Sequence, residues 1–398
     1  MAKILLIQHT NIIGGSLKGA IDLLECIVDK NNEIFFYIHN PTREICAFCE
    51  KYDIKLVMCH NNVISFDYFN GCNTILRVIF KFILRLPTFF VWQDHFDTNH
   101  YDVVILNTSV LWPLRRLIQN SGAKCFCYIR ETLKGKRYSF INKIICKELS
   151  LCDKVFFLTN FDFNTWNLTL SPSASCVFPE MVRRPNTIRS KKELFSQYKI
   201  KNNGFFILYM GGMQQIKGAD VIIQAMALIN HTKYKNLIKL IFMGDSGLDN
   251  TNLLNKVRYY HKTQYQKEWN QKVVTLQLDN CIYRIGYQYD VYSWIAASDI
   301  VVFPTQNAHQ ARPIYEAGIM HRTIIVPKFV NYMDNLQHNY NGLMFTPGDI
   351  DDLVNKIITL YENRDLLITL SENNYKLATD NHLFDTFKEK INQICCFN

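Results

Sequence analysis

The sequence lacks any uncharged apolar run of about twenty residues, the length that a membrane-spanning helix needs. It also lacks a recognisable export signal. Residues 1–10, MAKILLIQHT, place only four apolar residues after a lysine, which is too short for the apolar centre of a signal peptide. We therefore expect a cytoplasmic protein whose contact with a membrane, if it has one, is with the surface of the inner face.

Acidic residues are fewer than basic ones. The chain has 44 Lys and Arg against 35 Asp and Glu, and the net charge of +9 favours an anionic partner such as a nucleotide or a lipid headgroup. The basic residues are dispersed and form no aromatic–basic platform, so we expect no nucleic-acid partner. A hydrophobic content of 48% excludes a disordered chain, and 398 residues are too many for one ordinary core. Two domains are expected.

A second CxxC motif is missing as well. The thirteen cysteines are scattered and odd in number, which fits a reducing compartment better than a disulfide scaffold. Cys46 and Cys49 form one CxxC, with Cys59 and His60 further on, but no other pair completes a tetrahedral zinc site. Residues 42–52, TREICAFCEKY, are typical of an amphipathic helix in which cysteines pack as small apolar groups. We favour that interpretation and expect no metal.

Short apolar runs alternate with amphipathic segments along the whole chain. Continuous apolar strands separated by helices predict parallel sheets covered on both faces, and two such series predict two Rossmann-like α/β domains. We expect domains at 1–185 and 186–375, divided within the polar and basic segment 178–204, and a last helix in 376–398 that packs back on the first domain. The predicted strands lie at 3–8, 32–40, 54–59, 102–109, 124–131, 154–160, 205–212, 239–245, 281–286, 299–305 and 323–328.

Ligands of such sheets bind where strands end, and glycines follow two of the predicted strands. Gly14 and Gly15 would expose backbone amides at a helix start, which suits an anion, although a plain tight turn explains them equally well. Gly211 and Gly212 precede Lys217, and a helix that starts just after the lysine would aim its positive end at an anion. A solvated lysine is the alternative. The Lys-Gly order, without Ser or Thr after the lysine, excludes a P-loop.

The segment 307–318, NAHQARPIYEAG, follows the predicted strand 299–305. Arg312 can form paired hydrogen bonds with phosphate oxygens, and Pro313 suits the first turn of a helix. Glu316 could accept hydrogen bonds from two hydroxyls, as on a ribose. The alternative is a helix-start acid that contributes a few tenths of a kcal/mol.

Five blocks in the second half, in this order, resemble the retaining GT-B-fold glycosyltransferases of family 4: GGMQQIKGADVIIQAM, IFMGDSG, NCIYRIGYQYDVYSWIAASDIVVFPT, ARPIYEAG and NGLMFTPGDIDDLVNKI. The first half resembles them loosely, through GGS and LCDKVFFLT. The resemblance implies a GT-B architecture of two Rossmann-like domains facing across a cleft. The second domain would bind a nucleotide sugar and the first an acceptor. The sugar would move with retention of configuration and without a metal.

The resemblance also assigns roles by position. Lys217, Arg312 and Glu316 would form the catalytic set, in which Lys217 neutralises the diphosphate and Glu316 holds the ribose of a UDP- or GDP-linked sugar. Gly286 and Tyr287 would lie near the base. The remaining donor-binding candidates are Gly14, Gly15, Gly212, His309, Gln310 and Ala311.

Three positions depart from the family pattern. Ala308 replaces the first of two glutamates, so His309, Gln310 or main-chain amides would contact the sugar instead. Gly212 stands where many relatives have an arginine, and Arg312 would supply that charge.

Arg130 and Glu131 stand roughly where relatives often place a histidine, which makes them candidates for the acceptor side. The changes at Ala308 and Gly212 leave open a catalytically degenerate relative that binds a partner. A nucleotide-sugar epimerase, which would release its product without an acceptor, is a further alternative.

Residues 73–93, NTILRVIFKFILRLPTFFVWQ, place Arg77, Lys81 and Arg85 four apart, on one stripe of an otherwise apolar helix. Such a stripe predicts a helix at a membrane surface, with the cations at anionic headgroups. Pro87 and Trp92 also suit an interface. The alternative is a buried helix whose cations reach solvent. We favour the helix at a membrane surface, which would place the acceptor on a lipid carrier or a lipid-anchored glycan.

Asp349-Ile350-Asp351 forms a DxD, which holds a metal and a diphosphate in other glycosyltransferases. Here it precedes a predicted helix, where an aspartate commonly caps the first turn, and we favour the cap. Taken together, the sequence predicts a glycosyltransferase that acts in the assembly of a surface polysaccharide or another glycoconjugate.

Overall fold

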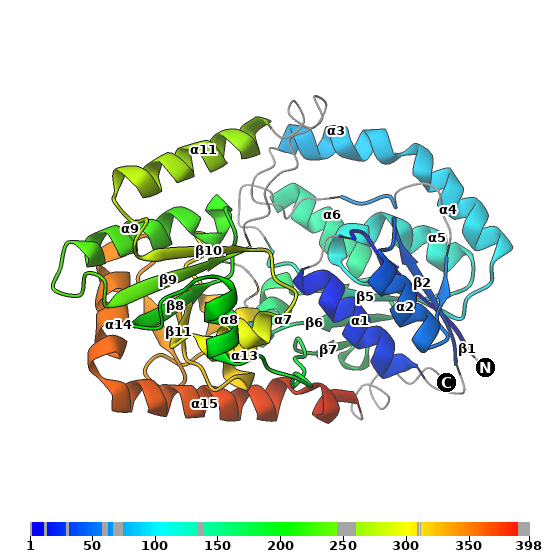
Figure 1. The fold of residues 1–398 in the computed structure, drawn as a ribbon. Helices are drawn as coiled ribbons and strands as arrows, with labels where there is room; N and C mark the ends of the chain where they lie inside the picture. Colours follow the sequence, from blue (N-terminus) through cyan, green and yellow to red (C-terminus); the bar gives the residue numbers. More distant parts are fainter. Residues whose placement is uncertain are drawn as a thin grey trace. The chain divides into compact units, whose positions relative to one another are not determined.

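The chain folds into two compact α/β units. In the computed structural model the described residues are 2–11, 14–28, 32–57, 63–66, 75–133, 139–244, 260–308, 310 and 312–388. One unit comprises Met1–Met181 with Phe384–Asn398, and the other Val182–Leu383. Each contains one parallel sheet with helices on both faces (Figure 1). The prediction of two Rossmann-like domains is therefore confirmed.

The first unit has a seven-stranded sheet of order β3-β2-β1-β4-β5-β6-β7. All of its strand pairs are parallel. The strand order reverses between β1 and β4, where the loops that follow these strands diverge to opposite faces of the sheet. The strands are β1 (Ala2–Gln8), β2 (Asn32–Ile38), β3 (Lys55–Leu56), β4 (Val103–Leu106), β5 (Lys124–Ile129), β6 (Lys154–Phe157) and β7 (Ser175–Val177).

Side chains alternate along these strands and so supply two cores. Ile4 and Leu6 pack against α1 (Gly15–Ile27) and α2 (Arg43–Lys51). Leu5 and Ile7 belong to the opposite core cluster. The elements on that side are α3 (Ile75–Arg85), α4 (Pro87–Thr98), the 3-10 helix η1 (Ser109–Leu114), α5 (Arg115–Asn120), α6 (Ser139–Leu149) and α7 (Asn160–Trp166). Within the described ranges, every helix is either too short or too polar to span a bilayer.

The second unit has a six-stranded sheet of order β10-β9-β8-β11-β12-β13, again with parallel pairs. Its strand order reverses between β8 and β11. The strands are β8 (Phe205–Tyr209), β9 (Ile238–Met243), β10 (Ile282–Gly286), β11 (Ile300–Val302), β12 (Ile324–Pro327) and β13 (Leu343–Phe345).

Two groups of helices cover this second sheet. One face carries α9 (Ala219–Asn230), α11 (Tyr260–Thr275) and α14 (Ile350–Glu362). The other carries α8 (Lys191–Gln197), α12 (Val291–Ala297) and α13 (Arg312–Ile319). The long helix α15 (Arg364–His382) packs along α13. At Gly318 of α13 a Cβ would lie 2.6 Å from the Cβ of Ala378, so the missing side chain permits this close packing.

The unit boundaries differ from those expected at 185/186 and 375/376. They lie at Met181/Val182 and Leu383/Phe384, because α15 continues without a break to His382 as part of the second unit. Phe384 and Phe387 then join the core of the first unit, on the side of α1. Strands β7 and β13, of three residues each, were not predicted from the sequence.

The structure tests how two motifs, the CxxC at Cys46 and Cys49 and the DxD at Asp349 and Asp351, were interpreted. Cys46 and Cys49 lie on α2, as predicted, and Cys49 is buried in the core, where burial raises the pKa of its thiol to about 11. Cys59 and His60 lie outside the described residues. Asp349 caps α14 by accepting a hydrogen bond of 2.9 Å from the Asp352 N–H, which confirms the cap. The described parts of the chain hold no group of three or more His, Cys, Asp or Glu side chains that could bind a metal.

Candidate active site

The candidate site of the second unit lies at the carboxyl ends of β8 and β11. The loop after β8 leads through the 3-10 helix η4 (Gln215–Lys217) to α9, and the loop after β11 leads to α13. The N–H of Gln306 donates to the carbonyl of Ile216 at 3.1 Å, and the Lys217 Nζ lies 5.4 Å from the centre of the Phe303 ring. The structure thus brings together the two motifs that the sequence placed after separate strands.

Glycines make this close approach possible. Gly218 has φ +83°, and a Cβ there would lie 1.9 Å from the carbonyl oxygen of Pro304. Gly212 has φ +61°, and its Cβ would lie 2.3 Å from the Gly244 oxygen. Gly244, with φ +96°, donates its N–H to the Gly286 oxygen at 2.8 Å. The ends of β8, β9 and β10 therefore meet along a path of glycines (Gly212, Gly244 and Gly286), where the backbones approach one another closely.

The packing at Gly212 explains one departure from the family pattern. No side chain fits at this position without a shift of the backbone around Gly244, so an arginine cannot stand there in this chain. A cation for a diphosphate must come from another element. Gly244 had no predicted role, because the predicted strand 239–245 included it, whereas β9 ends at Met243.

Lys217 is the cation nearest to this glycine path in sequence. Burial lowers the pKa of its side chain to about 8, since desolvation disfavours the charged form. The next helix, α9, begins at Ala219, and no side chain caps its first turn. The backbone amides of that turn carry partial positive charge. An anion bound there would gain from both groups and would favour the protonated form of Lys217.

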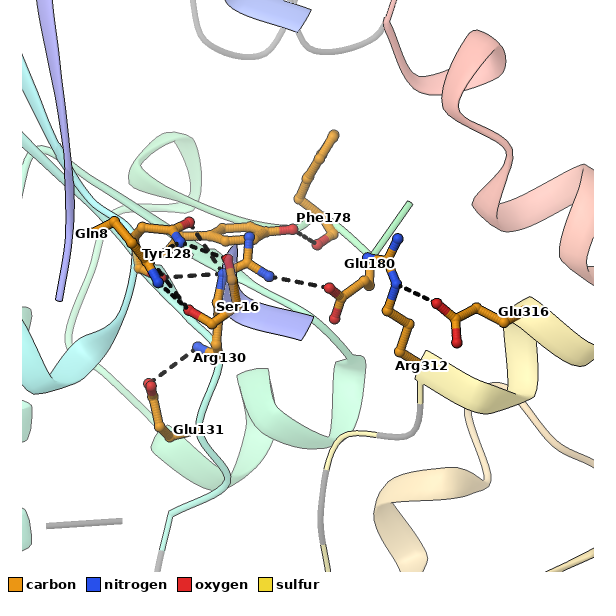
Figure 2. A network of polar contacts seen from close by, with 10 residues as sticks. Gln8, Ser16, Tyr128, Arg130, Glu131, Phe178, Glu180, Arg312 and Glu316 are labelled. Carbon is orange, nitrogen blue, oxygen red and sulfur yellow. Dashed lines mark hydrogen bonds and ion pairs between the residues drawn. The ribbon is translucent and has the colours of Figure 1, made fainter. Parts of the chain in front are cut away.

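Arg312 and Glu316 lie one turn apart on α13 and form an ion pair. The Arg312 Nε donates to the Glu316 Oε1 at 3.0 Å, and the two side chains are only 11% and 6% exposed (Figure 2). Glu316 is therefore a buried, paired carboxylate and not a solvated helix-start acid. From α15, the Asn374 side chain donates to the Ile314 carbonyl at 3.3 Å and so fixes α13 in place.

The other donor-side candidates are less constrained. Gln310 is half-buried just before α13, and Ala308 is exposed. His309 and Ala311 lie outside the described residues. Tyr287 follows Gly286, is 44% exposed and makes an edge-on contact with the Tyr289 ring at 5.2 Å between centroids. Two aromatic rings therefore stand at the end of β10.

In the first unit, a buried polar network ties together the ends of β1 and β4 and the start of α1. The Asn107 Nδ2 donates to the Gln8 Oε1 at 2.6 Å and to the Ser16 carbonyl at 3.0 Å. Gly14 is extended, with φ −164°, and no side chain caps α1. A Cβ at Gly15 would make only an ordinary contact, so sterics require glycine at neither position. Their possible contribution to ligand binding is therefore the backbone amides at the start of α1, which no side chain caps.

Arg130 sits at the centre of this network. Its Nε donates to both the carbonyl and the side-chain oxygen of Asn107 at 3.1 Å, and its Nη1 pairs with the Glu180 Oε1 at 3.4 Å (Figure 2). The guanidinium stacks 4.3 Å from the centre of the Tyr128 ring. A Cβ at Gly19 would lie 2.4 Å from it, which explains the glycine in α1.

Glu131 is engaged in a similar way. It accepts hydrogen bonds from the hydroxyls of Thr108 and Ser109, from the Ser109 N–H at 3.0 Å and from the Arg130 N–H at 3.2 Å. Both Arg130 and Glu131 therefore brace the ends of β4 and β5. Contact of either residue with an acceptor stays a prediction.

The prediction for residues 73–93 is wrong in part. Trp92 is fully buried and packs edge-on against Tyr37, with 4.7 Å between centroids, so it is not at an interface. Arg85 is half-buried and donates to the carbonyl and the hydroxyl of Ser65, so it is not aimed at headgroups. Lys81 is exposed, and the side chain of Arg77 lies outside the described part. Helical spacing gave the stripe but not the side of the helix that faces the core.

Comparisons with known proteins agree with this geometry. Residues 190–377 match the family Glycosyl transferases group 1. The capsular polysaccharide biosynthesis glycosyltransferase CapM of Staphylococcus aureus is 24% identical over 179 residues, which cover 45% of this chain and 42% of CapM. The chain thus matches less than half the length of this relative.

Similarity to solved structures extends over the whole chain. Anabaena HepE, solved in complex with UDP and glucose, has a TM-score of 0.77 at 17% identity, with 100% of both chains covered. S. aureus TarM, solved with UDP, has a TM-score of 0.69 at 13% identity, again with 100% of both chains covered. Residues 190–377 of the second unit are therefore similar to the glycosyl transferases group 1 family, and the chain has the GT-B fold of two Rossmann-like domains.

Proposed function

We propose that this protein is a glycosyltransferase that moves a sugar from a nucleotide-sugar donor to a glycan or lipid-linked acceptor. One observation carries the proposal. In a group 1 domain, Lys217 and the uncapped start of α9 lie against the loop that leads to the Arg312–Glu316 pair. That position, where the strand order of an open α/β sheet reverses, is where such sheets bind ligands.

The diphosphate of the donor would bind at the start of α9, beside Lys217. There the backbone amides in the first turn of α9, which no side chain caps, would face its oxygens. Departure of the nucleoside diphosphate builds up negative charge, and cations held in place before the reaction stabilise it without reorganisation. Lys217 has a lowered pKa, so the gain on pairing it with an anion is larger than for a solvated lysine.

The nucleoside would lie toward α13 and the end of β10. Glu316 would accept the ribose hydroxyls, and Arg312 would hold that carboxylate in one orientation. Tyr287 offers an exposed aromatic face for the base. With Ala308 in place of an acid, contacts to the sugar would fall to His309, Gln310 and the main chain.

The donor and acceptor classes follow from the relatives. HepE was solved with UDP and glucose, so a UDP-linked hexose is the first donor to test. CapM acts in capsular polysaccharide biosynthesis, so the acceptor we propose is a precursor of a surface polysaccharide.

We also propose retention without a metal ion. The anomeric carbon would exchange its bond to the phosphate oxygen for a bond to the acceptor oxygen on the same face, and the acceptor proton would leave with the diphosphate. Lys217, Arg312 and the amides of α9 would neutralise the charge that a divalent cation neutralises elsewhere.

A thermal-shift panel with UDP, GDP, ADP, TDP and CMP, each with and without EDTA, tests the proposal. One nucleoside diphosphate should stabilise the protein irrespective of EDTA. A ligand at a hundred times its Kd adds about 2.7 kcal/mol, or roughly 5–10 °C for a unit of this size. Lys217→Ala and Glu316→Gln should each reduce the shift at the same nucleotide concentration. Lys233→Ala, which changes a lysine on the surface, should keep it.

Two results would favour a function other than glycosyl transfer. If no nucleotide at millimolar concentration changed the melting temperature, a binding protein without catalysis would explain the chain better. If a UDP-sugar were consumed but the labelled sugar appeared free and not on the acceptor, an epimerase would. NMR of the transferred sugar reports whether its anomeric configuration is retained.

A further inference from the structure

Helix α3 and the start of α4 lie on the outside of the first unit (Figure 1), and their exposed side chains form an apolar surface. We call it the α3–α4 face. Its members are large hydrophobic side chains between 40% and 71% exposed: Ile79, Phe80, Ile83, Leu84, Leu86 and Phe90. Exposed apolar residues that occur singly need no explanation, whereas a contiguous set usually marks a contact surface.

The opposite side of α3 is firmly packed, so the exposure does not result from a loosely placed helix. Val78 is buried in the core, and Phe82 makes an edge-on contact with Phe66, with 5.4 Å between ring centroids. Arg85 adds hydrogen bonds to Ser65. Helix α3 is therefore apolar on both sides, and only one side is used inside the unit.

Helix α6 adds a second exposed stripe. Phe140, the most exposed of its apolar residues at 74%, and Ile144 are four apart, and Leu151 follows the end of the helix. Lys143 and Lys147 are exposed between them. On its inner side, α6 places Ile145 and Leu149 in the same core cluster as Val78 of α3, so the two helices cover the same face of the sheet.

The exposed charges of α3 and α6 are positive, and the acids of α4, Asp94 and Asp97, come after its start. Residues 68–93 contain neither Asp nor Glu, and Lys81 is exposed on α3. The one acid of α6, Glu148, is buried and paired with Arg115 and Arg116. A second copy of this chain would therefore bring lysines against lysines, whereas anionic headgroups would complement them.

We propose that the α3–α4 face and the α6 stripe dock the first unit on the surface of an anionic lipid bilayer. Phe80, Leu84 and Phe140 enter the boundary between headgroups and acyl chains, while Lys81 and Lys143 contact the headgroups. Helix α3 has eleven residues and is about 16 Å long, so it lies along the surface and does not span. This inference is independent of the proposed activity.

The test is sedimentation of the full chain with vesicles in 0.1 M salt. The wild type should bind vesicles of phosphatidylcholine with a quarter phosphatidylglycerol and bind pure phosphatidylcholine more weakly. Leu84→Glu and Phe80→Glu should each lower the partition coefficient at least tenfold. The matched control is Ile368→Glu on α15, because Ile368 at 60% is as exposed as Leu84 at 63%, and it should bind like the wild type.

The charge and the fold are checked separately. Lys81→Glu or 0.5 M salt should weaken binding to anionic vesicles and leave the weak binding to neutral ones unchanged. All four glutamate variants change exposed side chains, so their melting temperatures should match that of the wild type. Their thermal shift with UDP should also be unchanged, which separates this surface from the donor site.

Two outcomes would overturn the inference. The first is equal binding of Leu84→Glu, Ile368→Glu and the wild type to anionic vesicles, or no binding by any of them. The second is a wild-type dimer in sedimentation velocity without lipid that Leu84→Glu converts to a monomer. In that case the surface is an interface between two copies of the chain.

Discussion

Replacing Gly218 by alanine is expected to destabilise the second unit by about 2–5 kcal/mol. Its φ of +83° lies in the left-handed region, which costs an alanine about 1–2 kcal/mol. The added Cβ would also lie 1.9 Å from the Pro304 carbonyl oxygen, and relieving such a contact in a packed site costs about 1–3 kcal/mol. The second cost arises only if the loop after β11 lies against the start of α9.

Gly348 provides a matched control for this substitution. It has the same φ of +83°, lies in the same unit, and has no atom within 4 Å of the position of a new Cβ. Gly348→Ala therefore carries the conformational cost alone, about 1–2 kcal/mol. By differential scanning calorimetry the two variants should differ by about 2 kcal/mol, or about 6 °C for a unit of this size.

Nucleotide affinity gives a second measurement on the same pair. Gly218→Ala should bind UDP more weakly, because relief of the contact displaces the loop that leads to Arg312 and Glu316, whereas Gly348→Ala should bind it unchanged. Equal melting temperatures and equal affinities for the two variants would refute the reasoning. The two loops would then not hold each other, and the site as described would lose its basis.

Further predictions concern three buried side chains. UDP affinity should fall as the pH rises above about 8, because the pKa of Lys217 is lowered to about 8 and only the protonated amine attracts the diphosphate. Calorimetric titration between pH 7 and 9 should show this fall in the wild type and a flat profile in Lys217→Ala. Glu180→Ala leaves Arg130 buried without its carboxylate and should cost about 3–5 kcal/mol in urea unfolding. Adding Arg130→Met should recover part of that loss, and a double variant no more stable than the single one would contradict this account. Trp92→Ala should cost about 3–5 kcal/mol because it empties a core site, whereas a tryptophan at an interface would contribute little to unfolding.

The fold could be predicted because its strands are buried on both faces. Runs such as FFILY at 205–209 are apolar throughout, and the helices between them carry a clear periodicity. Strands β7 and β13 escaped prediction because they hold one β-branched residue and none, whereas the equally short β11 consists of Ile and Val alone. The return of the chain to the first unit was expected, but not the residue at which it occurs. The sequence of α15 does not indicate which of the two units the helix packs against.

The site could be predicted in outline but not in its contacts. Positions after parallel strands converge by construction, which placed Lys217 near the loop after β11. The pairing of Arg312 with Glu316 was available from their i,i+4 spacing and was not drawn. The contact between Gly212 and Gly244 depends on how neighbouring strands end in space, and no local pattern in the sequence carries that information.

The division of the first unit between the two ends of the chain has a consequence for its synthesis. Phe384 and Phe387 fill part of its core, and Phe387 lies edge-on to Phe178 with 5.4 Å between ring centroids. A ribosome makes these residues only after the whole of Val182–Leu383. Domains usually mature in the order in which they are made. Here the second unit has all of its residues first. The first unit lacks two aromatic side chains of its core until residues 384–387 have been made.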